Sequence, residues 1–223
     1  MSQTAEFIFF KLKPTVKPEG PNDEGNELLK LFNATKQQSG YHSSAWGRTV
    51  EDESVVAWVI VWTDARGASH SAQLAPFLEP KTSATTLYTT LVPSLTDTET
   101  LTTNPVTELV ALSFPTSLNP DEHSALNQNL IDFRTALTEK LEEGKRPVSW
   151  SMGHVDRPGG VEHTASPSGR AFVQFLAVGW ESVETHMAVR ETREFKETIQ
   201  LIREKALSPV EGLKMKHVSF KKI

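Results

Sequence analysis

The sequence contains no cysteine, no long apolar run and no excess of basic residues. Without cysteine there is no disulfide, no thiolate metal site, no iron–sulfur cluster and no thiol nucleophile. The formal net charge is −5, from 23 basic and 28 acidic residues, which is unlike a nucleic-acid-binding domain. No stretch approaches the roughly 18 apolar residues of a membrane span, and the apolar residues 7–10 are too few for a signal peptide. We therefore expect a cytoplasmic globular protein that binds neither nucleic acid nor membrane.

The common catalytic motifs are also missing. There is no phosphate-binding P-loop, no GxGxxG, no HExxH and no GxSxG. No two of the seven histidines have the i, i+4 spacing of a helical metal site. We predict no tightly bound metal.

The two halves of the chain show the same order of elements. Apolar strands are predicted at residues 6–10 and 108–112, and each is followed by a proline-containing loop and a helix. The second helix has a clear start at Asn119, with Pro120 next and Glu122 three residues on. Two further strands follow in each half, around a Gly47 and a Gly153 that align. A helical region then follows Trp62 in the first half and Trp180 in the second, and the second region is expected to break near Arg190. A closing strand ends each half, at residues 85–91 and 214–220.

The order β-α-β-β-α-β is that of a ferredoxin-like unit. The predicted fold class is therefore α+β, with two tandem ferredoxin-like units forming one pseudo-dimeric α/β barrel. Residues 1–92 are the first half, residues 93–105 an exposed linker rich in threonine and bracketed by prolines, and residues 106–223 the second half. The loop at 156–169 is predicted to be mobile. Because each half covers the sheet of the other, we expect a monomer.

One segment of the second half resembles a known family. Gly179-Trp180-Glu181-Ser182-Val183-Glu184-Thr185-His186, a later Phe195 and a last strand carrying His217 resemble the dimeric α/β-barrel superfamily. That group includes antibiotic-biosynthesis monooxygenase-like and stress-responsive barrel proteins. The resemblance covers residues 5–223 as two tandem copies. The first copy lacks the Gly and the Glu-Ser, and its His70 stands two residues later than its counterpart.

The interior of the barrel is the predicted pocket, lined by strand side chains of one parity. His217 and its counterpart Tyr88 in the closing strands, with His186 and His70, are the predicted catalytic residues, because imidazole is a general base near neutral pH. The predicted substrate-binding residues are Trp46, Trp58, Trp150, His154, Gln174 and Met215. For each of these residues core packing, or a hydrogen bond that serves the structure alone, is the alternative interpretation.

Three classes of function follow. The resemblance implies a cofactor-independent enzyme of monooxygenase or cyclase type that acts on a hydrophobic aromatic or polyketide-like molecule. In that enzyme a histidine would act as the base, and a Tyr or Gln side chain would stabilise the enolate oxygen. The first alternative is a protein that binds or degrades haem, with His186 or His70 as the axial ligand. The second is a barrel that binds a small ligand, or serves in a stress response, without catalysis.

Overall fold

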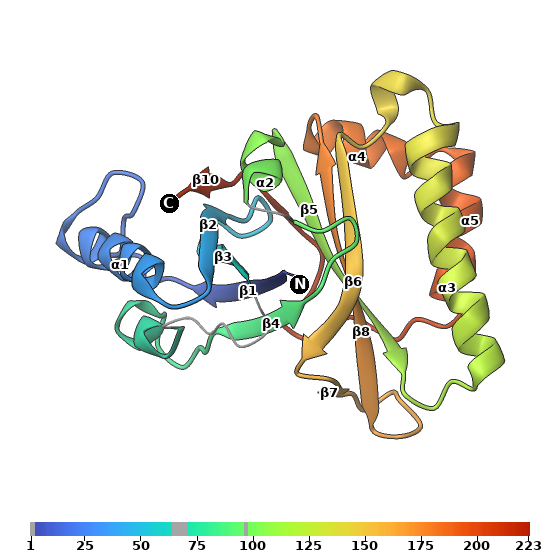
Figure 1. The fold of residues 1–223 in the computed structure, drawn as a ribbon, viewed down its shortest axis with the longest axis horizontal. Helices are drawn as coiled ribbons and strands as arrows, with labels where there is room; N and C mark the ends of the chain where they lie inside the picture. Colours follow the sequence, from blue (N-terminus) through green and yellow to red (C-terminus); the bar gives the residue numbers. More distant parts are fainter. Residues whose placement is uncertain (1–2, 64–70, 96–97) are drawn as a thin grey trace.

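The computed structural model describes residues 3–63, 71–95 and 98–223. The first part of the chain holds β1 (Thr4–Lys11), α1 (Asp23–Ala34), η1 (Thr35–Gln37), β2 (Tyr41–Arg48), β3 (Val55–Trp62), η2 (Ser71–Phe77), β4 (Thr85–Thr89) and α2 (Glu99–Thr103). The second holds β5 (Val106–Pro115), α3 (Pro120–Thr135), η3 (Ala136–Lys140), η4 (Glu143–Lys145), β6 (Ser149–Arg157), β7 (Val161–Glu162), β8 (Arg170–Trp180), α4 (Val183–Val189), α5 (Arg193–Arg203), β9 (Lys216–Val218) and β10 (Lys221–Lys222). Figure 1 shows their arrangement.

The strands form one curled antiparallel sheet in the order β10-β2-β3-β1-β4-β6-β8-β5-β9. Strands β1 and β5, which contain the predicted apolar strands, each lie between two neighbours. Strand β4 pairs with β6 and so joins the first part of the sheet to the second. At the other end a bridge between Thr49 and Val218, together with the pairing of β10 with β2, brings the last segment of the chain onto the β2 edge. The fold is therefore α+β with a barrel-like curled sheet.

Helix starts follow the local signals in the sequence. The side chain of Asn119 accepts from the backbone N–H of Glu122, and the Glu122 carboxylate accepts from the N–H of Asn119, so α3 begins with a complete capping box. The break expected near Arg190 is confirmed, because α4 ends at Val189 and α5 starts after a second cap at Thr192. Among the described residues, none of the helices is both long and apolar enough to cross a bilayer.

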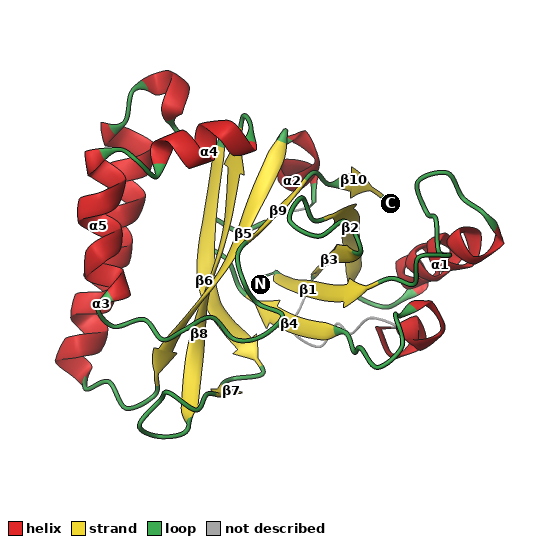
Figure 2. Cartoon of the chain, turned by 180° about the vertical axis from the view of Figure 1, so that it is seen from behind, coloured by secondary structure: helices red, strands yellow, loops and turns green. Residues whose placement is uncertain are grey.

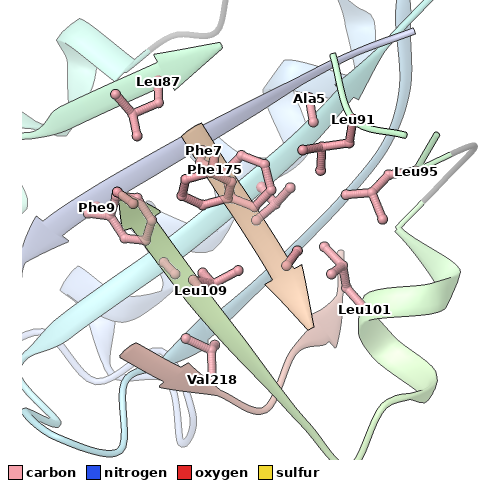
Figure 3. Close-up of a cluster of buried hydrophobic side chains, with 14 of the residues drawn as sticks. Ala5, Phe7, Phe9, Leu87, Leu91, Leu95, Leu101, Leu109, Phe175 and Val218 are labelled. Carbon is pink, nitrogen blue, oxygen red and sulfur yellow. The ribbon is translucent and has the colours of Figure 1, made fainter. Parts of the chain in front are cut away.

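Three apolar clusters stabilise the molecule. The inner cluster lies between the two parts of the sheet and contains Phe7 and Phe175, whose ring centroids are 4.5 Å apart (Figure 3). A second cluster lies between the outer face of β5, β6 and β8 and the helices α3, α4 and α5. Helices α3 and α5 stand side by side in Figure 2. A third lies between α1 and the outer face of β1, β2 and β3.

The predicted parity of the strands is wrong. Trp58, Gln174 and His217 were assigned to the barrel interior, but their neighbours on the same face belong to the two outer clusters. The inner face instead carries Val59, Val173, Phe175 and Val218. Both faces of these strands are buried, so alternation in the sequence could not identify the inner one.

Two segments predicted to be loops contain described residues that pack against the rest of the molecule. Residues 93–105 are not a fully exposed linker, because Leu95 and Leu101 belong to the inner cluster. In the loop at 156–169, β6 continues to Arg157, β7 pairs with β8, and His163 is buried, with its Nε2 2.8 Å from the carbonyl of Ser208. The threonine-rich composition of the first segment concealed the two leucines that anchor it.

Candidate functional site

A buried carboxyl group lies on the outer face of β5. The Oε2 of Glu108 accepts a hydrogen bond of 3.0 Å from Trp180 Nε1–H at the end of β8. In the sheet, Glu108 is the register partner of His217 on β9. Strand pairing thus brings together three residues that lie far apart in the sequence.

His186 of α4 covers this carboxyl group. Its ring stacks on the indole of Trp180, with 5.0 Å between centroids, and its Nε2 lies 3.4 Å from Glu108 Oε2. The cap of Ser182, whose Oγ accepts from the N–H of Thr185, sets where α4 begins and therefore where His186 points. The motif identified in the sequence thus positions one imidazole over Glu108.

The contacts continue away from Glu108. His186 Nδ1 lies 2.7 Å from His217 Nε2, and His217 Nδ1 lies 2.6 Å from Glu51 Oε1. Glu51 lies in the turn between β2 and β3, and its Oε2 also accepts a 2.9 Å bond from the backbone N–H of His217. The two histidine side chains are 1% and 2% exposed, whereas that of Glu51 is 39% exposed. The four side chains therefore form a continuous row from the interior to the surface.

Burial shifts the proton affinities along this row. Burial raises the pKa of Glu108 to about 7, against the lowering effects of the Trp180 hydrogen bond and of Arg190. Burial, with smaller contributions from His217 and Arg190, lowers the pKa of His186 to about 3. At neutral pH His186 is uncharged, and Glu108 exists in comparable amounts as acid and carboxylate. A carboxyl group of that kind can act as either general acid or general base.

A pocket of about 290 Å³ opens beside Glu108, between the sheet and α3, α4 and α5. Its wall is mostly apolar and includes Phe133, Trp150, Leu176 and Phe195, with Arg190 and Arg203 as its basic groups. The indole Nε1–H of Trp150 has no hydrogen-bond partner among the described residues. A buried donor without a partner favours a ligand that brings an acceptor.

The first half carries a related cluster at matching positions. Glu6 on β1 is the register partner of Tyr88 on β4, and it accepts hydrogen bonds from Trp62 Nε1–H at 2.9 Å and from the Tyr88 hydroxyl at 2.7 Å. Burial and the neighbouring Glu6 raise the pKa of Tyr88, and the Arg157 guanidinium lies 3.7 Å from the centre of its ring. Because its pKa is raised, the Tyr88 hydroxyl stays protonated and keeps donating its proton to Glu6.

The structure brings only some of the predicted site residues together. His186, Trp150 and Met215 line the pocket, and His217 contacts it through His186. Trp46 and Trp58 pack under α1, and Tyr88 belongs to the first-half cluster. His154 is exposed, Gln174 is buried on the helix-facing side of β8, and His70 lies outside the described residues. The predicted pocket between the sheets is instead the packed inner cluster.

Two carboxylates of the site were missed in the sequence. Glu108, like Glu6, is a single acidic residue at the start of an otherwise apolar strand, and this shared position in both halves was the available signal. Glu51 stands in an acidic turn, Glu51-Asp52-Glu53, where nothing distinguishes it from its neighbours. Only the pairing of the turn with β9 shows its role.

Around His186, the described residues do not fit haem as they are arranged. An axial histidine must offer a free ring nitrogen to iron, but His186 has one nitrogen against His217 and the other facing Glu108. The pocket volume is at the lower limit of the roughly 300–1,000 Å³ typical of sites for drug-sized ligands. Among the described residues, no group of three metal-ligating side chains gathers.

Solved structures with this fold are known, although no protein-family model and no curated protein sequence matches the chain. An anthrone oxidase-like protein is 13% identical, with a TM-score of 0.54 over 100% of this chain and 91% of that one. A proposed monooxygenase from Lactobacillus acidophilus is 9% identical (TM-score 0.54, covering 99% and 94%). A chlorite dismutase from Candidatus Nitrospira defluvii is 11% identical (TM-score 0.54, covering 97% and 91%). The chain thus shares its fold with these proteins, and the likeness extends over nearly the whole chain.

Proposed function

We propose that the protein is a cofactor-independent acid–base enzyme acting on a small hydrophobic molecule that carries an acidic oxygen or carbon. The observation that carries this proposal is the buried carboxyl of Glu108 at the wall of an apolar pocket, held by Trp180 and His186. The substrate lies between α3, α5 and the sheet, rather than inside the barrel.

The residues have separate roles in the proposed reaction. Ionised Glu108 removes a proton from the substrate, and neutral His186 keeps the carboxyl in place. The negative charge that develops on the substrate oxygen is stabilised by the guanidinium of Arg190, which lines the pocket. Phe133, Leu176 and Phe195 exclude water and hold the hydrocarbon part of the molecule.

Anthrone is the first substrate to test, because its ring ketone makes one carbon acidic and because one structural neighbour is described as anthrone oxidase-like. Deprotonated anthrone passes electrons to O₂, and anthrone plus O₂ gives anthraquinone plus water. We expect binding by tryptophan fluorescence and turnover by oxygen uptake, with Glu108→Gln lowering kcat by about 10² or more.

The matched control for that variant is Glu6→Gln, which removes the equivalent carboxylate from the first half. It should leave kcat within a few-fold of wild type. If a panel of anthrone, 1-naphthol and 1,3-diketones shows neither binding nor turnover, the proposal fails. A Soret band on titration with haemin would favour the alternative of a haem protein.

We further propose that the chain is a tandem of two ferredoxin-like units, a pseudo-dimer in which each sheet covers the other. The matching registers of Glu6 with Tyr88 and of Glu108 with His217 support this, as do the strand orders β2-β3-β1-β4 and β6-β8-β5-β9. Light scattering after size exclusion should give the mass of one chain, 24.8 kDa. A stable dimer that exchanges sheets between chains would contradict it.

A further inference from the structure

The row Glu108, His186, His217 and Glu51 has a consistent hydrogen-bond direction. Glu51 accepts from the backbone N–H of His217, and as a carboxylate it also accepts from His217 Nδ1–H. A neutral His217 then has a lone pair on Nε2, which accepts from His186 Nδ1–H. His186 in turn presents a lone pair on Nε2 toward Glu108. Every donor in the row therefore points from the pocket toward Glu51.

We propose that these four side chains are a proton relay between the pocket and solvent, with Glu51 as its outer end. One proton leaves Glu108 for His186 Nε2, the Nδ1 proton of His186 moves to His217 Nε2, and the Nδ1 proton of His217 moves to Glu51. Each imidazole gains one proton and loses one, so neither acquires a net charge. The step from Glu108 is the longest, with 3.4 Å between its Oε2 and His186 Nε2.

In the proposed function, Glu108 must lose the proton that it takes from the substrate, and the relay provides a route for that proton. The role of the relay in turnover therefore rests on the proposed function. A base that takes a proton in a dry pocket must release it before the next cycle. Glu108 and His186 are almost without solvent contact, whereas the Glu51 side chain is 39% exposed. Glu51 also lines a second pocket, of about 280 Å³. The outer end of the row is therefore open to water.

The charged groups around the row come from four elements. Arg190, the residue after α4, and Glu51 have opposite effects on Glu108, since the guanidinium favours the carboxylate and Glu51 opposes it. On β9, Lys216 lies next to His217 on the other face, where burial lowers its pKa to about 8. Arg203 of α5 lines the first pocket. None of these groups interrupts the contacts between the two histidines.

The first test needs no substrate. Protein labelled with ¹⁵N-histidine should show His186 and His217 as Nδ1–H tautomers in long-range ¹H–¹⁵N spectra. An Nε2–H tautomer of either ring would break the direction of the row and overturn the proposal.

The second test measures exchange of the His217 Nδ1 proton with water. Glu51→Gln keeps an acceptor for this N–H but cannot take up its proton, so exchange should slow by about tenfold or more. Glu53→Gln, which removes the same charge from the same turn, should leave the rate at the wild-type value. Equal rates in Glu51→Gln and wild type would overturn the relay.

A variant at the pocket end of the row, Glu108→Gln, distinguishes a relay from a purely structural contact. Glu108 and His217 are paired through the backbone of β5 and β9, but the Glu108 carboxyl group reaches the His217 ring through His186. A relay therefore requires Glu108→Gln to slow exchange at the His217 ring as well. In wild type the rate should fall as pH rises through the titration of Glu108, opposite to ordinary base-catalysed exchange, and this measurement needs no variant. If exchange responds to Glu51 alone, the row is a structural contact and not a relay. If it responds to both ends while no ligand binds, the relay stands and the proposed substrate class is wrong.

Discussion

Glu108 is the residue whose protonation matters most, and an adjacent indole reports on it. The Nε1–H of Trp180 donates directly to its carboxyl group. We predict that the ¹H–¹⁵N signal of the Trp180 indole shifts with a midpoint near pH 7, because burial raises the pKa of Glu108 to about that value. The sequence has five tryptophans, so Trp180→Phe assigns the signal.

The titration has an internal control. Trp58 is fully buried in the α1 cluster, away from Glu108, and its indole signal should stay fixed over the same range. In Glu108→Gln the Trp180 signal should also stay fixed. A midpoint near pH 4.5 for wild type would show that Glu108 ionises as an ordinary carboxyl group.

Glu108 and His186 affect stability in opposite directions. The raised pKa of Glu108 means that the folded protein holds a proton which the unfolded chain has released, so the free energy of unfolding falls between pH 4.5 and about 7, by roughly 3 kcal/mol. The lowered pKa of His186 means that the unfolded chain binds the extra proton, so the free energy of unfolding rises between about pH 3 and 6.5. The two slopes oppose each other where the intervals overlap.

Glu108→Gln should separate the two contributions. The amide keeps an acceptor for Trp180 and a donor for His186, but it does not titrate. Urea unfolding from pH 5 to 8 should show that the variant gains stability relative to wild type as pH rises, while Glu53→Gln follows the wild-type profile. Parallel curves for Glu108→Gln and wild type would mean that Glu108 has the same pKa folded and unfolded.

At the scale of elements, patterns of hydrophobicity and caps were sufficient to predict most of the strands and helices. The capping box of α3 and the break before α5 were both visible in the sequence. The face of each strand was not predictable, since β1 and β8 are buried on both sides. The choice of His186, Trp150 and Met215 depended on residue type and position, and these three do line the pocket. Glu51 reaches the row only through the packing of a turn against β9, which no local pattern encodes.

Two glycines allow strands of one half to cross segments of the other. A Cβ atom on Gly153 of β6 would lie 2.1 Å from the carbonyl oxygen of Thr90, and one on Gly47 of β2 would lie 2.4 Å from that of Ser219. Both obstacles are backbone atoms, so they cannot move aside cheaply. The aligned Gly47 and Gly153 thus mark the two places where the halves come closest.

We predict that Gly153→Ala lowers the free energy of unfolding by about 1–3 kcal/mol or more, because the chain segments must separate to admit the methyl group. Gly144→Ala is the control, since a Cβ atom there meets open space, and it should change stability by no more than about 0.5 kcal/mol. Urea denaturation measures both. A neutral Gly153→Ala would show that the β4–β6 junction is looser than the structure indicates.

At the scale of the whole molecule, the inner cluster takes side chains from both parts of the sheet. Phe7 of β1 is fully buried against Phe175 of β8, and Leu95 and Leu101 of the connecting segment join them (Figure 3). Neither half can leave without exposing apolar surface of the other. This arrangement favours a single cooperative unit over two independent domains.

We predict that both halves unfold in one transition. The Trp62 indole reports on the first half through Glu6, and the Trp180 indole on the second through Glu108. Both signals should disappear at the same urea concentration, and Phe7→Ala should move both midpoints together, with a loss of about 3–5 kcal/mol. Ile131→Ala on the exposed face of α3 is the control and should move neither by much. If Phe7→Ala releases Trp62 while Trp180 keeps its native signal, the inner cluster does not couple the halves, and the pseudo-dimer would have to be described as two domains in contact.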